Sequence, residues 1–377
     1  MPETVEIGLG REARRGYHLD EVALVPTRRT RGSTVVSTAW QIDSYTFELP
    51  FVAAPSDAVV SPATAVEIER LGGLAVLNGE GLWTRYEDPS EQLARITSED
   101  GCTTAELQRI YAQPVSEELL AQRVAELRTS GVRVAVRLSP QHTVAYSGAV
   151  LKAGTDILVI QGTIISAEHV ASEHAADAAL NLKTFIADLD IPVIVGGCTN
   201  YQTALHLMRT GAAGVIVGYG AHSGSTTHSA LGIEVPMATA IADAAAARRA
   251  YLDETGGRYV HLVAYGDMAT GGDIAKALVC GADAVMLGEP LAIAEEAPGG
   301  GRYWDATASH PRLPRSALVD LGVDSDAPTL EEVLVGPTAD ATGERNLFGG
   351  VSRVMAKCGY SSVKEFQKAE LIVAGVR

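Results

Sequence analysis

Short apolar runs alternate along this chain with longer helical patterns, and this alternation constrains the fold more than any other feature. The runs are continuously apolar, which is typical of parallel strands that are covered on both faces. We expect strands at residues 51–54, 74–77, 132–138, 156–160, 192–195, 213–217, 259–264 and 284–287. We expect helices at residues 62–71, 117–128, 167–189, 201–210, 236–255 and 273–280. Repeated strand–helix units of this kind predict an α/β protein with a closed (β/α)8 TIM barrel.

The barrel does not account for the whole chain. We expect an N-terminal arm at residues 1–48, a barrel core at 49–297, a Gly-, Pro- and Asp-rich mobile surface extension resembling a flap at 298–346, and a C-terminal helix packing on the barrel at 347–377. The arm contains two basic clusters, Arg11–Arg15 and Arg28–Arg31. Each cluster is interpreted either as a solvated face or as a subunit contact.

The charge balance narrows the class of partner. The 377 residues include 46 Asp and Glu against 30 Lys and Arg, a net charge of −16. An acidic surface repels phosphate backbones, so we expect no nucleic-acid partner. The four cysteines lack metal-ligand spacing, the N-terminus is not a signal peptide, and no apolar run reaches the length of a membrane span. We therefore expect a cytoplasmic protein that does not bind membranes.

The segment Val217–His228 reads VGYGAHSGSTTH and follows a predicted strand, where α/β barrels keep their catalytic residues. It resembles the active-site loop of the IMP dehydrogenase and GMP reductase family, V-G-x-G-P-G-S-x-C-T-T. Residues 272–288 and 346–360 resemble further motifs of that family, and residues 82–113 are too few to hold its CBS modules. The resemblance is to the short IMP dehydrogenase-related type. It implies a TIM barrel that binds a purine nucleotide and NAD(P) and assembles as a homo-oligomer, a tetramer or an octamer.

The resemblance also identifies the residue on which catalysis depends. Ser225 stands where the family has its nucleophilic cysteine, and a serine hydroxyl attacks only with an adjacent base. His222 or His228 could supply that base. Thr227 matches the family threonine that helps to activate water. Cys198, at the open end of the fifth strand, is either a displaced thiol nucleophile or a buried apolar residue.

Several ligand-binding positions have changed as well. Of the family's phosphate ligands, Ser223 and the backbones of Gly266 and Gly288 remain, but two carboxylates, Asp267 and Glu289, now stand beside them. A carboxylate ~4 Å from a phosphate oxygen costs about 4 kcal/mol per unit charge at an effective dielectric constant of ~20. The carboxylates could escape this by pointing away or by pairing with His222, His228 or Arg302. The remaining altered positions are Tyr265 for the ribose-binding Asp and Gln161 for an Asp near the cofactor.

Two hypotheses follow from these residues. In the first, the active site is degenerate, the ordinary IMP dehydrogenase reaction is lost or altered, and the protein binds an effector or regulates a catalytic paralogue by hetero-assembly. Alternatively, it is an active NAD(P)-dependent purine nucleotide oxidoreductase with a non-standard nucleophile. The resemblance also implies a possible K⁺ site at the carbonyls of Gly218, Gly220 and Ser225. Tyr265 and His222 could serve a different ligand.

Overall fold

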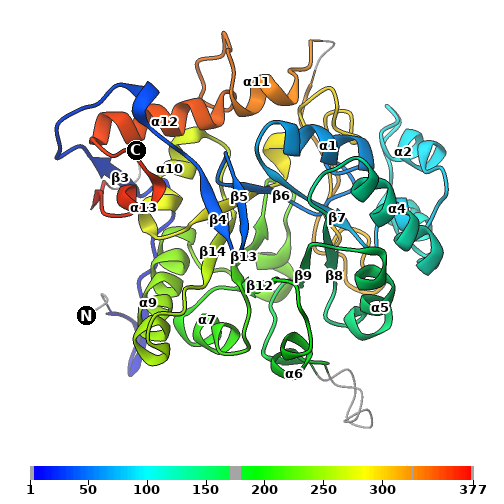
Figure 1. Cartoon of the computed structure of the whole chain (residues 1–377), viewed down its shortest axis with the longest axis horizontal. Coiled ribbons are helices and arrows are strands. Elements are labelled where there is room, and N and C mark those ends of the chain that lie inside the picture. The colour runs from blue at the N-terminus through cyan, green and yellow to red at the C-terminus, as the bar shows by residue number, and fades with distance from the viewer. Residues whose placement is uncertain (1–3, 170–179, 324–325, 375–377) are drawn as a thin grey trace.

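Eight parallel strands close into a barrel in the computed structural model, which describes residues 4–169, 180–323 and 326–374. Figure 1 shows the barrel surrounded by helices. The strands are β6 (Phe51–Ala53), β7 (Leu74–Asn78), β8 (Ala135–Leu138), β9 (Ile157–Gln161), β12 (Val193–Cys198), β13 (Gly214–Ala221), β14 (His261–Gly266) and β15 (Ala284–Leu287). The predicted TIM barrel is confirmed, and all eight strands fall within or beside the predicted runs.

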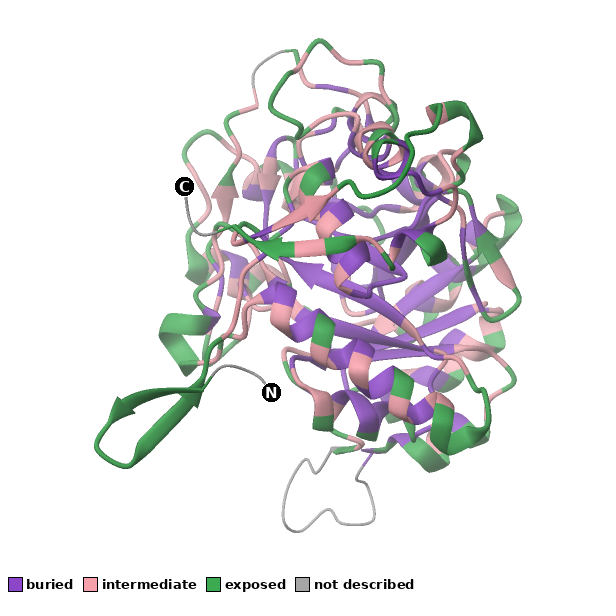
Figure 2. Cartoon of the chain, turned by 90° about the vertical axis from the view of Figure 1, so that its left-hand side faces the viewer, coloured by how far each residue is buried: buried purple, intermediate pink, exposed green. Residues whose placement is uncertain are grey.

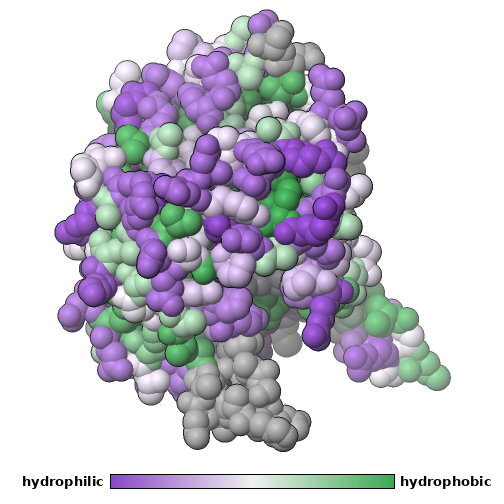
Figure 3. Space-filling model, turned by 90° about the vertical axis from the view of Figure 1, so that its right-hand side faces the viewer, coloured by the Kyte–Doolittle hydropathy of each residue, from purple (hydrophilic) through white to green (hydrophobic). Residues whose placement is uncertain are grey.

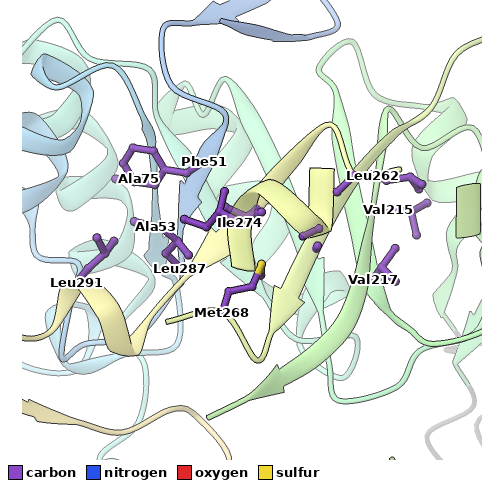
Figure 4. Close-up of a cluster of buried hydrophobic side chains, with 14 of the residues drawn as sticks. Phe51, Ala53, Ala75, Val215, Val217, Leu262, Met268, Ile274, Leu287 and Leu291 are labelled. Atoms are coloured by element: carbon purple, nitrogen blue, oxygen red, sulfur yellow. The ribbon is translucent and has the colours of Figure 1, made fainter. Parts of the chain in front are cut away.

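Burial on both faces explains why these strands are continuously apolar. Alternate residues fill the inside of the barrel, where Val52, Ile216 and Val263 belong to one buried cluster. The residues between them face the surrounding helices and form a second, larger cluster. Figure 4 shows part of this outer cluster, with Phe51 and Leu287 beside Ile274. The barrel is therefore a filled core, and ligands have access only at its ends.

The helices that cover the barrel are α1 (Pro62–Arg70), α4 (Glu117–Thr129), α5 (Thr143–Ala153), α6 (Leu182–Ala187), α7 (Tyr201–Met208), α9 (Met237–Thr255) and α10 (Gly271–Cys280). Capping boxes at Ser61 and Thr270 fix where α1 and α10 begin. The predicted helix at 167–189 is wrong over most of the part that the structure describes. There β10 (Glu168–His169) pairs with β11 (Leu180–Asn181), α6 is short, and residues 170–179 lie outside the described residues. Helix α5 was not predicted.

Further short helices lie outside the repeating units. They are α2 (Ser90–Ile96), α3 (Thr104–Tyr111), α8 (Thr227–Leu231), α11 (Leu330–Leu334), α12 (Leu347–Cys358) and α13 (Val363–Phe366). Helix α12 contacts the barrel through Phe348, whose ring stacks on Phe51 at a centroid distance of 5.3 Å. After α13, strand β18 (Glu370–Val373) pairs with β3 (Val22–Val25), so the two ends of the chain share a sheet. Within the described residues, we find no helix that is both long and apolar enough to span a bilayer.

The segment 298–346 is not the simple surface extension that we predicted. Strand β16 (Arg302–Tyr303) pairs with β17 (Val319–Asp320), and the side chains of Tyr303 and Trp304 are each only 1% exposed. Large aromatic side chains stabilise a fold most when they leave water, and these two enter the carboxyl end of the barrel. The extension therefore forms one wall of the barrel mouth.

The N-terminal arm begins with a hairpin of β1 (Thr4–Gly8) and β2 (Arg11–Arg14). Figure 2 shows this hairpin projecting from the body of the molecule, exposed along its whole length. A second hairpin, β4 (Trp40–Ile42) and β5 (Tyr45–Phe47), closes the amino end of the barrel by packing Trp40 and Phe47 against the interior cluster. This leaves the carboxyl end as the open mouth.

Candidate functional site

In four of the eight barrel strands the last inward-facing side chain is polar, and these four side chains line the barrel mouth. They are Asn78 on β7, Arg137 on β8, Gln161 on β9 and Tyr265 on β14. Two residues earlier in each strand the inward side chain is apolar and belongs to the interior cluster. The change from apolar to polar marks the depth at which the core ends and a binding site begins.

Two cavities open at this mouth, and Tyr265 lines both. One, of about 520 Å³, lies between the loops after β13, β14 and β15 and includes Ser223, Asp267 and Glu289. The other, of about 470 Å³, lies over β7, β8 and β9 and includes Arg137 and Gln161. We call the first the acidic cavity, because its lining residues, all within the described ranges, include Asp267 and Glu289 but no Lys or Arg. We call the second the arginine cavity, because Arg85, Arg137 and Arg315 line it.

Ser223 holds a carboxylate of the protein itself. Its backbone N–H donates to Oε2 of Glu289 at 2.9 Å, and its hydroxyl donates to Oε1 at 2.5 Å. A side-chain hydroxyl and an adjacent N–H that converge on two oxygens form an anion site. In this structure the anion in that site is Glu289. The sequence predicted that Glu289 would stand near Ser223, but not that it would take both of the donors.

Two tyrosines occupy space beside glycines of the same loops. A Cβ on Gly220 would lie 2.3 Å from the ring of Tyr265, and a Cβ on Gly288 would lie 2.3 Å from the hydroxyl of Tyr303. The two hydroxyls are 3.4 Å apart, and the ring of His222 meets that of Tyr303 edge-on at 4.8 Å. Burial raises the pKa of both tyrosines, so both are neutral at physiological pH. They cannot replace the charge of a ribose-binding carboxylate.

Asp267 lies in a tight turn directly after β14. Its backbone adopts a left-handed conformation with φ of 55°, which Asp tolerates better than most residues, and its N–H donates to the carbonyl of Ala221 at 3.2 Å. This N–H is therefore not free to bind an anion. The surrounding protein displaces water and raises the pKa of Asp267, with nearby Glu234 and Asp20 adding to the rise and His18 opposing it.

The three side chains that could have paired with Asp267 and Glu289 have other partners. Their partners are Asp305 for His222 (3.4 Å), Glu234 for His228 (2.9 Å) and Asp320 for Arg302 (3.3 Å). Within the described part of the chain, neither Asp267 nor Glu289 forms an ion pair. Of the two ways in which the carboxylates could avoid a phosphate, pairing with His222, His228 or Arg302 does not occur in the structure.

His222 ties the active-site loop to the extension. Its Nδ1 accepts the N–H of Gly224 at 3.1 Å, so the ring proton is on Nε2, which lies 2.9 Å from Oγ of Ser316 and 3.4 Å from Asp305. Burial opposes ionisation of Asp305, but hydrogen bonds from His222 and Thr307 outweigh it and lower its pKa. Because both ring nitrogens are occupied, His222 is not available as a base for Ser225.

Ser225 itself is held by backbone contacts. Its N–H donates to the carbonyl of His222 at 2.9 Å, it bridges to Ser316, and the next N–H, of Thr226, donates to the carbonyl of Arg315 at 2.8 Å. Among the described residues, no hydrogen bond joins the Ser225 hydroxyl to a histidine. The structure therefore places Ser225 at the mouth without the base that a serine nucleophile requires.

The other two expected catalytic residues are buried. Cys198 is 0% exposed and belongs to the outer cluster, so its thiol faces the helices rather than the mouth. Burial raises its pKa to about 12. A thiol in that state is neither accessible nor ionised, and the role of displaced nucleophile does not fit it. Thr227, 2% exposed, begins the short helix α8.

The glycines of the expected K⁺ site have special backbone conformations. Gly218 and Gly220 have φ of 98° and 78°, and the pairing of β13 with β14 is irregular between Val217 and Ala221. Only Gly adopts such angles readily. The chain therefore bends sharply before the loop that holds Ser225.

A charged cluster in the arginine cavity was missed by the sequence analysis. Glu80 lies 3.6 Å from Arg137 and 2.7 Å from Nδ1 of His142, and it accepts the N–H of Ser139 at 2.5 Å. Burial disfavours the Glu80 carboxylate, but Arg137 and His142 outweigh burial and lower its pKa to about 2. The hydrogen bond to Glu80 raises the pKa of His142. The polar residues Asn78 and Arg137 near the ends of two strands were the signal that could have pointed to this group.

Asp57 belongs to a second unpredicted network. It is 1% exposed, and its Oδ2 accepts from the hydroxyl of Tyr111 at 2.6 Å, while that hydroxyl accepts from Nε1 of Trp304 at 2.8 Å. Burial raises the pKa of Asp57 to about 6. The network joins the first barrel strand to the extension across the mouth.

Comparison with known proteins agrees with this architecture. A family model for the IMP dehydrogenase / GMP reductase domain matches residues 16–310. A crystal structure of an IMP dehydrogenase/GMP reductase-like protein from Corynebacterium glutamicum superposes with a TM-score of 0.92 at 53% identity, covering 98% of this chain and 97% of that one.

Relatives by sequence include two proteins described as uncharacterized oxidoreductases. The one from Mycolicibacterium smegmatis is 57% identical and the one from Mycobacterium leprae 56% identical, over 98% of this chain and at least 99% of theirs. An inosine-5'-monophosphate dehydrogenase from Methanocaldococcus jannaschii is 26% identical over 85% of this chain and 74% of its own length. The chain belongs to the IMP dehydrogenase/GMP reductase family.

Proposed function

We propose that this protein binds a small purine-related molecule at the barrel mouth and that the ordinary IMP dehydrogenase reaction has been lost or altered. The observation that carries the proposal is that both the N–H and the hydroxyl of Ser223 donate hydrogen bonds to Glu289. A nucleotide monophosphate would have to displace this carboxylate. The residues that line the acidic cavity, all within the described ranges, include no Lys or Arg that could neutralise the phosphate. A ligand-binding or regulatory role is favoured.

The chemistry of the nucleophile supports the same proposal. The family reaction, as the resemblance implies it, needs a thiolate at position 225. Ser225 has no base, and Cys198 is buried behind the barrel wall. Neither residue supplies the nucleophile.

The proposal also includes NAD(P) binding, in the arginine cavity. The arginine cavity presents Arg137 and Arg315, which could meet the phosphates of a dinucleotide, and Gln161, whose Oε1 is buried without a partner among the described residues. Arg315 now donates to the hydroxyl of Thr163 at 3.1 Å and would have to release it. The left-handed turns at Gly218 and Gly220 are compatible with a K⁺ site.

The assembly state and location are also proposed. We infer a cytoplasmic homo-oligomer, a tetramer or an octamer, because the chain belongs to this family. A regulatory role would further allow hetero-assembly with a catalytic paralogue. Co-purification of tagged and untagged copies tests whether the protein forms a homo-oligomer. Mass spectrometry of the purified complex tests whether a paralogue is part of it.

The decisive experiment measures turnover and binding together. We expect no change in the absorbance of the reduced nicotinamide with IMP plus NAD or with GMP plus NADPH, across a range of K⁺ and pH. We expect Ser225→Cys to remain inactive, because Glu289 still holds Ser223. Thermal-shift titrations should show stabilisation by a phosphate-free purine and little by IMP. Turnover by the wild-type protein would overturn the proposal.

The alternative is an active NAD(P)-dependent oxidoreductase with a non-standard nucleophile. The observation that favours it is the Glu80–His142 pair beside Arg137, because an ion-paired histidine at a cavity wall can transfer protons. His142→Ala separates the two functions. It would abolish turnover in the active enzyme and leave ligand stabilisation in the acidic cavity unchanged.

A further inference from the structure

The acidic cavity carries negative charge that the protein itself does not compensate. Four carboxylates line it, and its lining residues, all of them described, include no Lys or Arg. One of the four, Asp273, belongs to the capping box of α10 and lies 3.0 Å from Lys276, which offsets its charge. Glu344 is exposed, so water screens its charge. The charges that remain are those of Asp267 and Glu289.

These two carboxylates lack a cationic partner. The oxygens of Glu289 accept hydrogen bonds from the N–H and the hydroxyl of Ser223, and both of these donors are neutral. In the part of the chain that the structure describes, nothing donates a hydrogen bond to the Asp267 carboxylate. Loss of water raises the pKa of Asp267, and the opposing effect of His18 does not prevent the rise. A cation from outside the chain would supply the missing partner.

The shape and lining of the cavity match an organic cation better than a metal ion. Among the described residues, no three Asp, Glu, His or Cys side chains converge as metal ligands do. On the outer face in Figure 3, hydrophobic residues are scattered among hydrophilic ones, whereas in the cavity the carboxylates share the wall with Met268, Met286 and Leu287. Apolar walls with a few polar groups, around about 520 Å³, are typical of small-molecule sites.

A buried hydroxyl in the same cavity gives independent evidence for a ligand. Tyr265 and Tyr303 both line the cavity and are 8% and 1% exposed. Their hydroxyls share a single hydrogen bond of 3.4 Å, so one of the two protons has no acceptor within the described ranges. Buried polar groups in proteins are nearly always hydrogen-bonded. The ligand should therefore carry an oxygen or nitrogen acceptor as well as its positive charge, and a nucleoside offers such acceptors on its sugar and base.

We propose that the acidic cavity binds a nucleoside-sized organic cation whose ammonium group pairs with Asp267 and Glu289. The resemblance to the family implies a phosphate at Ser223, Gly266 and Gly288, and the two carboxylates reverse the charge that this position accepts. The cation is the phosphate-free ligand of the proposed function, so the assignment of its charge rests on that proposal.

The test compares three probes that share one base and one sugar. They are 5′-amino-5′-deoxyinosine, inosine and IMP, which are positive, neutral and negative at the 5′ position. In isothermal titration of the full-length protein, the amine should bind about 100-fold more tightly than inosine, since each carboxylate contributes about tenfold. IMP should bind more weakly than inosine. An advantage of the amine below about tenfold would overturn this inference and leave the proposed function standing, whereas failure of both inosine and the amine to bind would overturn both.

A charge-neutral variant locates the ammonium group. Asp267→Asn keeps a residue that tolerates the left-handed backbone, so the fold should be retained. It should reduce the advantage of the amine about tenfold and leave the affinity for inosine unchanged. The matched control is Glu344→Gln, an exposed carboxylate of the same cavity, which should change that advantage by at most about threefold because its charge is screened. An undiminished advantage in Asp267→Asn, or an equal loss in both variants, would overturn the assignment.

Discussion

Replacing Glu289 by Ser should turn the acidic cavity into a phosphate site. The change leaves the two donors of Ser223 free. Because an incoming phosphate would use the same donors, it would lie within about 4 Å of the carboxylate. The repulsion is then ~4 kcal/mol per pair of unit charges at an effective dielectric constant of about 20, and ~1 kcal/mol in water.

Glu289 is half-buried, so the cost lies between these limits, at about 2–3 kcal/mol. The released donors add about 1.5–3 kcal/mol, since each hydrogen bond would be to a charged group. We expect Glu289→Ser to bind IMP about 100-fold or more tightly than the wild type, because 1.4 kcal/mol corresponds to a factor of ten. Isothermal titration with IMP, and with inosine as the phosphate-free probe, measures the difference. Inosine should bind both proteins equally.

Glu344→Ser is the matched control. Glu344 is exposed and lines the same cavity, so the substitution removes the same charge without releasing Ser223. Its effect on IMP affinity should be at most about fivefold, because a solvated charge is screened. The reasoning fails if Glu289→Ser and Glu344→Ser change IMP affinity to the same extent, or if inosine gains as much as IMP.

Further predictions concern the pH dependence of stability and the accessibility of buried side chains. The raised pKa of Asp57 means that the folded state binds its proton more tightly than the unfolded state, so the free energy of unfolding should fall by about 3 kcal/mol as pH rises from ~4 to ~7. Urea unfolding should show that Asp57→Asn flattens this slope. The lowered pKa of Glu80 has the opposite sign, and its stabilisation is lost as pH falls from ~4.5 towards ~2. Glu80→Gln should lower the stability at neutral pH by about 3 kcal/mol in the same assay, because Arg137 loses its charged partner. Cys198 should resist a thiol reagent until the protein unfolds, as peptide mass spectrometry would show, and a thiol labelled in the native protein would contradict its burial.

The sequence predicted the barrel because burial on both faces leaves a local signal, a continuous apolar run. It failed at residues 168–169 and 180–181, where β10 pairs with β11, because helix propensity is a weak preference that strand pairing overrides. It also failed at Tyr303 and Trp304, where Gly-, Pro- and Asp-rich neighbours indicated an exposed extension. Composition averages over a segment, whereas two aromatic side chains are enough to anchor it.

For the candidate site, the sequence identified the loops but not the contacts. The residue types at Ser223, Tyr265 and Glu289 could be read directly. The bond between Ser223 and Glu289 spans 66 residues and that between Asp57 and Tyr111 spans 54, so no spacing rule predicts either. Which donor a carboxylate accepts from depends on side-chain directions at the ends of separate strands. Those directions exist only once the barrel has closed.

The altered residues fit one another, and this bears on what the site does now. Tyr265 occupies space that only a glycine at position 220 leaves open, and the Tyr303 hydroxyl does the same over Gly288. Glu289 satisfies both donors of Ser223. The proposed loss of phosphate binding therefore depends on side chains that pack together across three loops of the acidic cavity. In the arginine cavity, by contrast, Oε1 of Gln161 and Nε of Arg315 are buried without partners among the described residues, and each such group costs about 1–3 kcal/mol.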